Sequence, residues 1–224
     1  MPVVIAFVSQ KGGVGKSTLA RALAVAAAGA GWKVELFDLD PLQRTLMLWD
    51  KTRRQNNIAP AITVDTVDDF RKAIAAADED TLLIFDTPGQ VSQQIQEIAQ
   101  HADLIVQPTG PTQDDLHPAL LVFQALTNVG VSDERLVFAL CRTLSKREEG
   151  AAYHKLMTSG YAVLPGSIPE DIAYREAHDK GKALTETRKG ALNRRALALL
   201  DPLLRYAHTT IAASRMKQRR AVRK

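Results

Sequence analysis

The stretch Val3–Thr18 reads VVIAFVSQKGGVGKST, a short apolar run, a glycine-rich bend and the opening of an alanine-rich helical pattern. This order predicts a buried strand, a phosphate-binding loop and the N-terminus of a helix. Glycine takes backbone conformations that other residues avoid, so successive N–H groups can turn towards phosphate oxygens, and the helix dipole adds positive charge there. The predicted nucleotide-binding residues of this loop are Lys11, Gly12, Gly13, Val14, Gly15, Lys16, Ser17 and Thr18.

Two side chains of this loop have specific expected roles. In loops of the pattern G-x-x-x-x-G-K-[ST], the lysine reaches the β- and γ-phosphates and the hydroxyl binds Mg²⁺, which assigns Lys16 and Ser17. The pattern requires glycine where this chain has Gln10, and a second lysine, Lys11, follows at the entrance of the loop. A glycine-rich turn with incidental lysines is the alternative, but the strand, loop and helix signals agree with one another.

The segment KGGVGKST resembles the deviant Walker A box of the ParA/MinD family of ATPases, which has a signature lysine at the position of Lys11. The resemblance covers most of residues 1–185 and implies that the chain binds ATP with Mg²⁺ and hydrolyses ATP. It also implies a homodimer with ATP, in which Lys11 reaches the phosphates of the partner copy. The catalytic residues implied in this way are Lys11, Lys16 and Asp40.

Two carboxylates follow the second predicted strand, Lys33–Asp38. Asp38 and Asp40 could simply cap the next element, because Asp before Pro often begins a turn. Their place at the carboxyl end of a strand beside the phosphate loop favours a role at the nucleotide and Mg²⁺, and Asp38 is a predicted metal ligand. The run FDLDPLQ resembles the family's D-x-D-P-Q box with the glutamine displaced by one position. The resemblance implies that Asp40 orients or activates the water that attacks the γ-phosphate.

A third carboxylate ends the hydrophobic strand predicted at Thr81–Asp86. Buried strands that end in Asp near a phosphate loop form the Walker B element, whose carboxylate holds Mg²⁺, commonly through water. A hydrophobic strand with a terminal Asp is weak evidence alone, but the order and spacing after the loop assign Asp86 as a metal ligand.

Two later segments are assigned to the adenine base. Arg142 stands at the carboxyl end of the strand predicted at Leu136–Leu140, where similar proteins have a residue that flanks adenine, and a salt bridge is the alternative role. The run GSIPEDIAYREAHDKGKALTE is similar to a stretch of the family in which the backbone after the proline receives the adenine edge. This similarity places Pro169 and Glu170 at the base, although Ala183 stands where the family often has proline.

The alternation of strands and helices predicts an α/β fold, with a doubly wound, mostly parallel sheet and helices on both faces, the fold of P-loop NTPases of the deviant Walker A type. The 224 residues, 46% hydrophobic and 24% charged, suit one such domain, placed at 1–212, with a basic tail at 213–224. The five histidines have no metal-ligand spacing, and Cys141 is expected to be buried. In the helix predicted at Thr45–Asn57, Trp49 is expected to pack in the core, and Arg53 and Arg54 to be exposed.

Positive charge is concentrated at the end of the chain. Residues 180–224 contain 13 Lys and Arg against two acidic residues, a balance of +11, whereas the preceding residues contain 16 against 23, a balance of −7. Such a segment favours a polyanionic partner, with sequence-independent double-stranded DNA first. The predicted DNA contacts, on and beyond a final helix at Glu186–Ala213, are Arg188, Arg195, Arg215, Arg219 and Arg220.

Alternatives to DNA binding stay open at this point. A basic tail can be disordered and solubilising, and a MinD-like membrane ATPase would need bulky apolar residues beside the basic ones, of which the tail offers only Met216 and Val222. No secretion signal and no apolar run of about 20 residues is visible, so a cytoplasmic protein with no membrane partner is expected. The resemblance to the ParA branch implies that it is also associated with the nucleoid. A metal-centre ATPase like the nitrogenase iron protein would need more cysteines than Cys141.

The resemblance is greatest to short ParA-type partition ATPases. It implies an ATP dimer on nucleoid DNA that segregates a plasmid, chromosome or other cargo, with hydrolysis stimulated by a ParB-like centromere-binding protein or another cargo adaptor. A conjugation or microcompartment-positioning ATPase of the same fold is the alternative cargo class. No DNA-reading domain precedes Val3, so operator binding is not expected.

Overall fold

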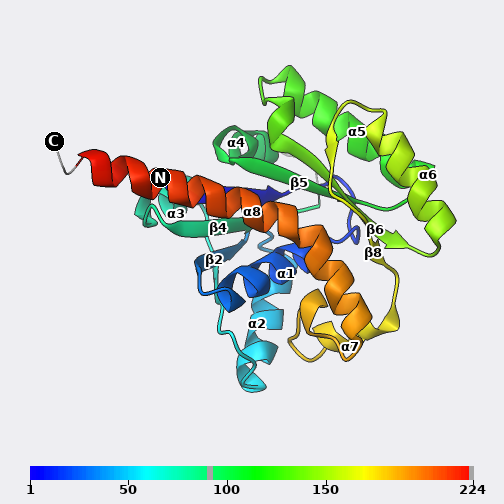
Figure 1. Ribbon diagram of the computed structural model, residues 1–224, viewed down its shortest axis with the longest axis horizontal. Helices are drawn as coiled ribbons and strands as arrows, with labels where there is room; N and C mark the ends of the chain where they lie inside the picture. Colours follow the sequence, from blue (N-terminus) through cyan, green and yellow to red (C-terminus); the bar gives the residue numbers. More distant parts are fainter. Residues whose placement is uncertain (90–92, 222–224) are drawn as a thin grey trace.

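A computed structural model describes residues 1–89 and 93–221, with side chains of the last helix described as far as Ala212. Strands and helices alternate along most of the chain (Figure 1). The strands are β1 Val3–Phe7, β2 Lys33–Asp38, β3 Thr63–Thr66, β4 Thr81–Asp86, β5 Leu104–Thr109, β6 Leu136–Thr143, β7 Ala162–Val163 and β8 Ile168–Pro169. The helices are α1 Lys16–Gly29, α2 Thr45–Gln55, α3 Phe70–Ala76, α4 Gln93–His101, α5 Gln113–Asn128, α6 Lys146–Met157, α7 Ile172–His178 and α8 Gly190–Ala221, with short 3-10 turns η1 Asp133–Arg135 and η2 Leu184–Glu186.

The strands form one sheet in the order β3-β2-β4-β1-β5-β6-β7, with β8 paired to β6. Every pairing between described strands is parallel. The chain goes from β1 to β2 and β3 on one side of the sheet, returns to β4 beside β1, and then continues to β5, β6 and β7 on the other side. Because parallel connections have one handedness, this change of direction places helices on both faces. The predicted doubly wound parallel sheet is therefore confirmed.

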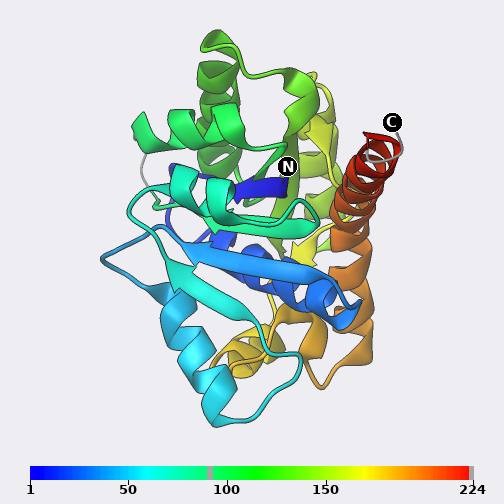
Figure 2. The ribbon, with the colours of Figure 1, turned by 90° about the vertical axis from the view of Figure 1, so that its left-hand side faces the viewer.

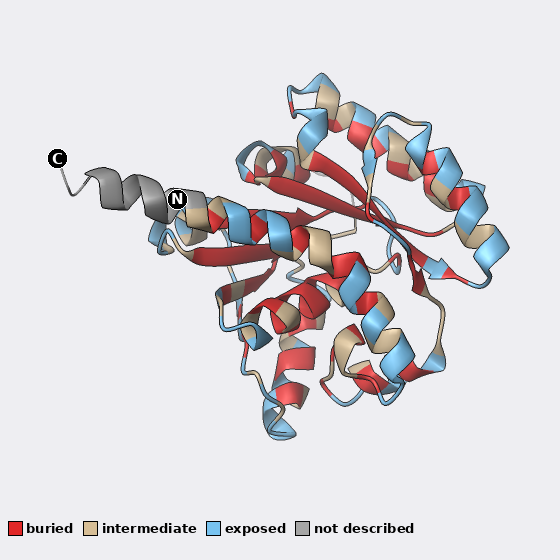
Figure 3. Ribbon diagram, viewed as in Figure 1, coloured by how far each residue is buried: buried red, intermediate tan, exposed pale blue. Residues whose placement is uncertain are grey.

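The side chains of β1 show how each face of the sheet is covered. Val3, Ile5 and Phe7 belong to a buried cluster that includes residues of α1, α2, α7 and α8. Val4 and Ala6 point to the other face and belong to a cluster with residues of α3, α4, α5 and α6. Figure 2 shows the sheet between these two helix layers, and Figure 3 shows its central strands β1, β4 and β5 buried. A strand that is apolar at every position is what two buried faces require.

The strand register brings the acidic residues to the edge where the glycine loop lies. Asp38 of β2 is in register with Asp86 of β4, and Asp86 is in register with Phe7, the last residue of β1. Because parallel strands end at the same edge of the sheet, two carboxylates from distant parts of the sequence lie beside the loop that comes after β1.

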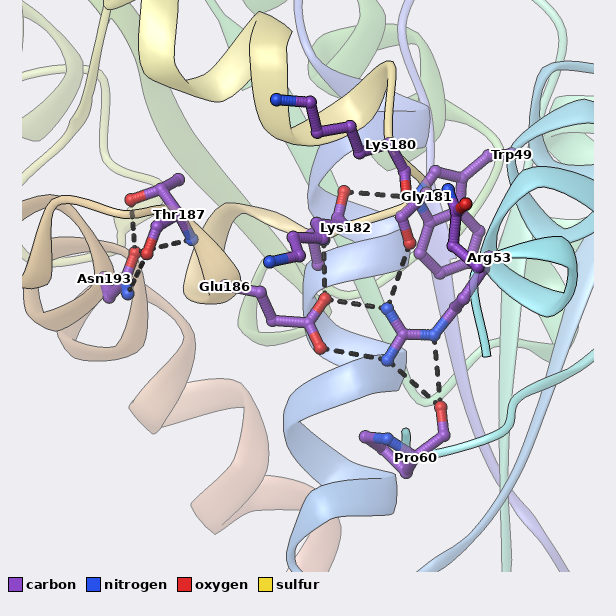
Figure 4. A network of polar contacts seen from close by, with 11 residues as sticks. Trp49, Arg53, Pro60, Lys180, Gly181, Lys182, Glu186, Thr187 and Asn193 are labelled. Carbon is purple, nitrogen blue, oxygen red and sulfur yellow. Dashed lines mark hydrogen bonds and ion pairs between the residues drawn. The ribbon is translucent and has the colours of Figure 1, made fainter. Parts of the chain in front are cut away.

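Arg53 is buried rather than exposed, which corrects the sequence prediction. Its side chain is 1% exposed and its guanidinium contacts both carboxylate oxygens of Glu186, at 2.7 and 2.9 Å (Figure 4). It also donates to the carbonyl oxygens of Pro60 and Gly181, each at 3.1 Å, and lies over the Trp49 ring at 5.3 Å. A Cβ atom at Gly181, whose φ is 76°, would overlap the backbone of Arg53. The helix α2 therefore packs directly against the segment that comes after α7.

The last helix differs from its prediction at both ends. It begins at Gly190 rather than Glu186, because Glu186 is held by Arg53 in η2 and the Thr187 hydroxyl accepts a hydrogen bond from the Lys189 N–H at 3.1 Å. Its backbone continues to Ala221, past the predicted end at residue 213, so the proposed separation of a tail at 213–224 stays a prediction. In this helix Ala196, Leu199 and Leu203 are buried, whereas Tyr206 is 38% exposed.

Candidate functional site

The glycine loop lies between β1 and α1, at the carboxyl end of a central strand. Gly13 and Gly15 have φ angles of 73° and 115°, in the left-handed region that favours glycine. Gly15 also caps α1, and its carbonyl oxygen accepts a hydrogen bond from the Leu19 N–H at 2.9 Å. The unpaired N–H groups of the first helical turn therefore open onto the loop, as an anion-binding site requires.

Lys16 points its ammonium group into a crowded part of the loop. It is 8% exposed, and burial lowers the pKa of its ammonium, while the negative charges of Asp86 and Asp40 act in the opposite direction. A Cβ atom on Gly89 would lie 3.5 Å from Nζ of Lys16 and 3.6 Å from the Gly12 nitrogen. Gly89, which follows β4, thus lies directly against the loop.

The carboxylates of Asp38 and Asp40 stabilise the turn after β2. Asp38 accepts hydrogen bonds from the N–H groups of Leu46, at 2.9 Å, and Asp40, at 3.1 Å. Asp40 accepts hydrogen bonds from the N–H groups of Gln43, at 2.9 Å, and Leu42, at 3.1 Å. The alternative role considered for them, as caps, is therefore present in the structure. It does not exclude a second role, because both residues also line the cavity beside the loop.

The cavity beside the glycine loop, which we call the phosphate cavity, has a volume of about 210 Å³. The loop forms one wall through glycines and Lys16, and the ends of β2 and β4 form the other through Asp38, Asp40 and Asp86. A cluster of backbone N–H groups and one ammonium thus faces three carboxylates across a small space. Such a cavity suits a phosphate chain together with a divalent cation.

Asp86 has the environment of a metal-binding carboxylate. It is 3% exposed, its carboxylate is hydrogen bonded to the Ser17 hydroxyl, and its Oδ1 atom has no hydrogen-bond partner among the described residues. Burial raises the pKa of Asp86 to about 7, against the opposing effects of Ser17 and the charge of Lys16. A free carboxylate oxygen beside a hydroxyl fits Mg²⁺, which binds one or two carboxylates and takes phosphate oxygens and water for the rest. Accordingly, the described residues contain no cluster of three or more His, Cys, Asp or Glu that could hold a metal alone.

Lys11 lies at the rim of the loop and turns away from the phosphate cavity. Its ammonium pairs with the carboxylate of Asp115 and lies 3.4 Å from the carbonyl oxygen of Asp114, at the N-terminal end of α5. Burial opposes ionisation of Asp115, but hydrogen bonds from Lys11 and Thr112 outweigh it and lower the pKa of Asp115. The side chain of Lys11 is 45% exposed, so it can reach other partners once this contact opens.

A second cavity, of about 410 Å³, adjoins the first at Gly13, Gly15 and Thr18. We call it the base cavity. It is lined by all three residues assigned to adenine from the sequence, Arg142, Pro169 and Glu170. Arg142 lines the cavity and also makes the alternative salt bridge, with its Nε atom 3.3 Å from Glu170. Its φ of 62° marks an irregularity near the end of β6, where the register with β8 shifts between Cys141 and Thr143. Cys141 is buried at the cavity wall, as expected, and burial raises its pKa to about 12.

Several lining residues were not predicted from the sequence. Asp171 accepts a hydrogen bond from the Ala173 N–H at 2.8 Å and so begins α7, which presents Asp171, Tyr174 and His178 to the base cavity. Their spacing of three and four residues is that of one helix face, a signal that could have found them. Arg21 lines the phosphate cavity from α1 and donates to the Ser17 carbonyl oxygen at 3.0 Å. Nothing in the sequence pattern distinguishes it from a surface arginine.

The basic residues predicted to contact DNA fall into three groups. Arg188 is exposed just before α8. Arg195 is half-buried and donates to the carbonyl oxygen and hydroxyl of Ser167, at 2.7 and 2.6 Å, and to Glu149 at 2.6 Å, which argues for a structural role rather than a DNA contact. Arg215, Arg219 and Arg220 lie outside the residues whose side chains the structure describes.

A glycine loop after a central parallel strand, a helix N-terminus beside it and carboxylates at the ends of neighbouring strands together define a nucleotide-binding P-loop protein. The family model that matches the chain, over residues 5–184, is the CobQ/CobB/MinD/ParA nucleotide-binding domain. The chain belongs to this family. Protein ParA of Rhizobium radiobacter is 31% identical over 184 residues, which are 78% of this chain and 81% of that protein.

Solved structures share the fold of this chain. The MinD cell division ATPase of Pyrococcus furiosus superposes with a TM-score of 0.67 at 22% identity, covering 92% of this chain and all of that one. A plasmid partition protein of Borrelia burgdorferi B31, bound to AMPPNP, superposes with a TM-score of 0.72 at 16% identity, again over 92% of this chain and all of that one. The described part of the chain has no helix with the length and apolar character to cross a bilayer.

Proposed function

We propose that this protein is a partition or positioning ATPase that dimerises when it binds ATP with Mg²⁺ and hydrolyses ATP to separate again. In this proposal the ATP dimer binds double-stranded DNA without sequence preference, in the cytoplasm at the nucleoid. A ParB-like or other cargo-bound partner stimulates hydrolysis and so moves a plasmid, chromosome or other cargo. Membership of the MinD/ParA family and the 31% identity to a ParA protein support this choice.

The single observation that carries the proposal is the phosphate cavity, in which Lys16, Asp40 and Asp86 surround a space next to the glycine loop. Hydrolysis of a phosphoanhydride needs mostly positioning and charge stabilisation, and this cavity supplies both. The loop N–H groups and Lys16 hold the β- and γ-phosphates. Ser17, Asp38 and Asp86 are proposed to hold Mg²⁺, which neutralises phosphate charge when it is bound.

Asp40 is proposed to orient the attacking water. Its carboxylate is fixed by two N–H groups at 2.9 and 3.1 Å, so it cannot swing freely, and it is only half-buried, so water can reach it. Lys11 is proposed to contact the phosphates of the partner copy, because in the single chain it points to Asp115 and away from the cavity of its own loop.

The test uses Asp40→Ala and Lys16→Ala beside the unmodified protein. Asp40→Ala should retain ATP binding and ATP-dependent dimerisation but lose about 100-fold or more in turnover, since removal of one positioned catalytic group costs that much. Lys16→Ala should lose ATP binding itself. Dimerisation is read by light scattering and DNA retention by binding to random duplex DNA at low salt, with and without ATP. An unaltered turnover of Asp40→Ala would refute its role, and a single-subunit mass with ATP would refute the dimer.

A further inference from the structure

His178 has an incompletely hydrogen-bonded side chain beside the base cavity. It is the last residue of α7 and lines that cavity. Its Nε2 atom is buried and has no hydrogen-bond partner among the described residues. A buried nitrogen without a partner destabilises the folded protein, so its presence calls for an explanation, and a ligand that supplies the missing bond is one.

The imidazole of His178 is uncharged in this environment. Burial lowers its pKa to about 3, and the nearby positive charge of Arg21 acts in the same direction. A neutral imidazole has one nitrogen that donates and one that accepts a hydrogen bond. It can therefore pair with an uncharged polar group, and it has no net charge with which to attract phosphate. The chemistry of the side chain favours a nucleobase over the phosphate chain.

The rest of the base cavity supports the same ligand. It continues from the glycine loop, where the phosphates would bind, and its walls include the apolar side chains of Leu19, Ile168 and Leu184 and the ring of Tyr174. The Tyr174 hydroxyl is already engaged, since it donates to the Leu192 carbonyl oxygen at 3.2 Å. A flat base has apolar faces and polar edges. A cavity that combines apolar walls with placed polar groups is the usual site for such a ligand, and the polar groups set its specificity. Here the polar lining beside His178 includes Arg142, Glu170, Asp171 and Arg175.

The segment directly after His178 is held in place by α2. Two side chains of α2 and the side chain of the residue that caps its C-terminus donate to the carbonyl oxygens of the three consecutive residues 180–182 (Figure 4). Asn56 donates at 3.0 Å, and Arg53 and Trp49 each at 3.1 Å. These hydrogen bonds fix the backbone that directly follows His178. The position of the His178 side chain at the end of α7 is stabilised in this way, as specific recognition of a ligand requires.

The geometry points to His178 as the residue that reads the edge of the nucleobase, through a hydrogen bond from or to its Nε2 atom. This inference rests on the proposed function, since it requires that ATP binds at the glycine loop. It assigns to α7 a specificity role that is separate from the phosphate contacts. It also explains why a polar atom is left unpaired in the nucleotide-free chain.

The experiment replaces the imidazole and, separately, the polar groups of the base. The affinity of His178→Leu is measured by calorimetry for ATP and for analogues in which the 6-amino group or one ring nitrogen is replaced by hydrogen or C–H. His178→Leu should bind ATP about tenfold more weakly, the loss of one hydrogen bond. For the analogue that lacks the contacted group, the unmodified protein and His178→Leu should bind equally well. Analogues of ATP without the 2′- or 3′-hydroxyl test whether His178 contacts the ribose instead of the base.

Two further variants separate binding from folding. His178→Gln places an amide near the position of Nε2 and should restore most of the ATP affinity. His154→Leu, the same change at an exposed histidine of α6, should leave ATP affinity unaltered. At pH 8, without nucleotide, His178→Leu should melt at or above the temperature of the unmodified protein, because the unpaired nitrogen is gone. A purely structural histidine would show the opposite, a lower melting temperature with unchanged affinity.

Each outcome decides between the two proposals. If the unmodified protein does not bind ATP, the proposed function fails. If it binds ATP and His178→Leu binds equally well, only the role of His178 is overturned. That role is also overturned if the loss persists for every base analogue, if it vanishes for a deoxyribose analogue instead, or if His178→Gln binds as weakly as His178→Leu.

Discussion

Removal of the Arg53 side chain should destabilise the whole fold, because its guanidinium makes five hydrogen bonds in a site from which water is nearly excluded. Arg53→Met leaves the carbonyl oxygens of Pro60 and Gly181 without this donor and Glu186 without its counter-charge. Breaking a buried pair by removing one partner costs about 3–5 kcal/mol. Glu186 is 19% exposed and keeps a hydrogen bond from the Ala183 N–H at 2.8 Å, so part of its charge can be hydrated. We therefore expect about 3 kcal/mol, at the lower end of that range.

The loss is measured by urea unfolding at 25 °C, monitored by far-UV circular dichroism. Glu186→Gln should cost less, since an amide oxygen can still accept from the guanidinium, and the double variant should lose less than the sum of the two single losses by at least about 1 kcal/mol. Arg205→Met is the matched control, because Arg205 pairs with Asp201 on the exposed face of α8 and should contribute no measurable stability. A loss below about 1 kcal/mol for Arg53→Met, or additive single losses, would refute this reasoning.

Two other predictions concern charge. Asp115→Asn should weaken the hold on Lys11 and, if Lys11 acts on the partner copy, lower the ATP-dependent dimer dissociation constant several-fold in light scattering; an increase would contradict this. His178 has a pKa of about 3 in the folded chain and about 6.5 when unfolded, so between these values the unfolded state binds more protons and stability must rise with pH. The stability of the unmodified protein relative to His178→Gln should therefore increase by about 1 kcal/mol per pH unit below pH 6 in urea unfolding, and a flat difference would contradict the buried neutral imidazole.

The glycine loop and the strand-terminal carboxylates could be predicted because their chemistry is local. Gly13 and Gly15 need positive φ angles, and an apolar strand that ends in Asp86 leaves few places for that carboxylate except the edge of the sheet. The bounds of β2 and β4 were predicted without error for the same reason, since a buried strand is marked at both ends by polar residues. Features that depend on one short segment of the chain were therefore accessible from the amino-acid sequence.

The burial of Arg53 and of His178 could not be predicted because their environments are built from distant segments. Arg53 and Arg54 are adjacent and chemically identical, yet one is 1% exposed and the other 65%, because only Arg53 faces Gly181 and Glu186 across the fold. The isolated pattern of α2 contains no trace of these partners. In the same way, the spacing of Asp171, Tyr174 and His178 marks one face of α7, but the burial of His178 on that face depends on residues of α1 and η2, which lie far away in the sequence.

The packing of α8 over α1 has a consequence for how the chain is made. Apolar residues of α8, among them Leu199 and Leu203, lie in the same buried cluster as Leu19 and Leu23 of α1. The helix α1 is thus covered by a helix that is synthesised much later, so a nascent chain carries the uncovered apolar surface of α1 until α8 has been made. Unfinished chains are the ones that should aggregate or recruit chaperones, because exposed apolar surface drives both.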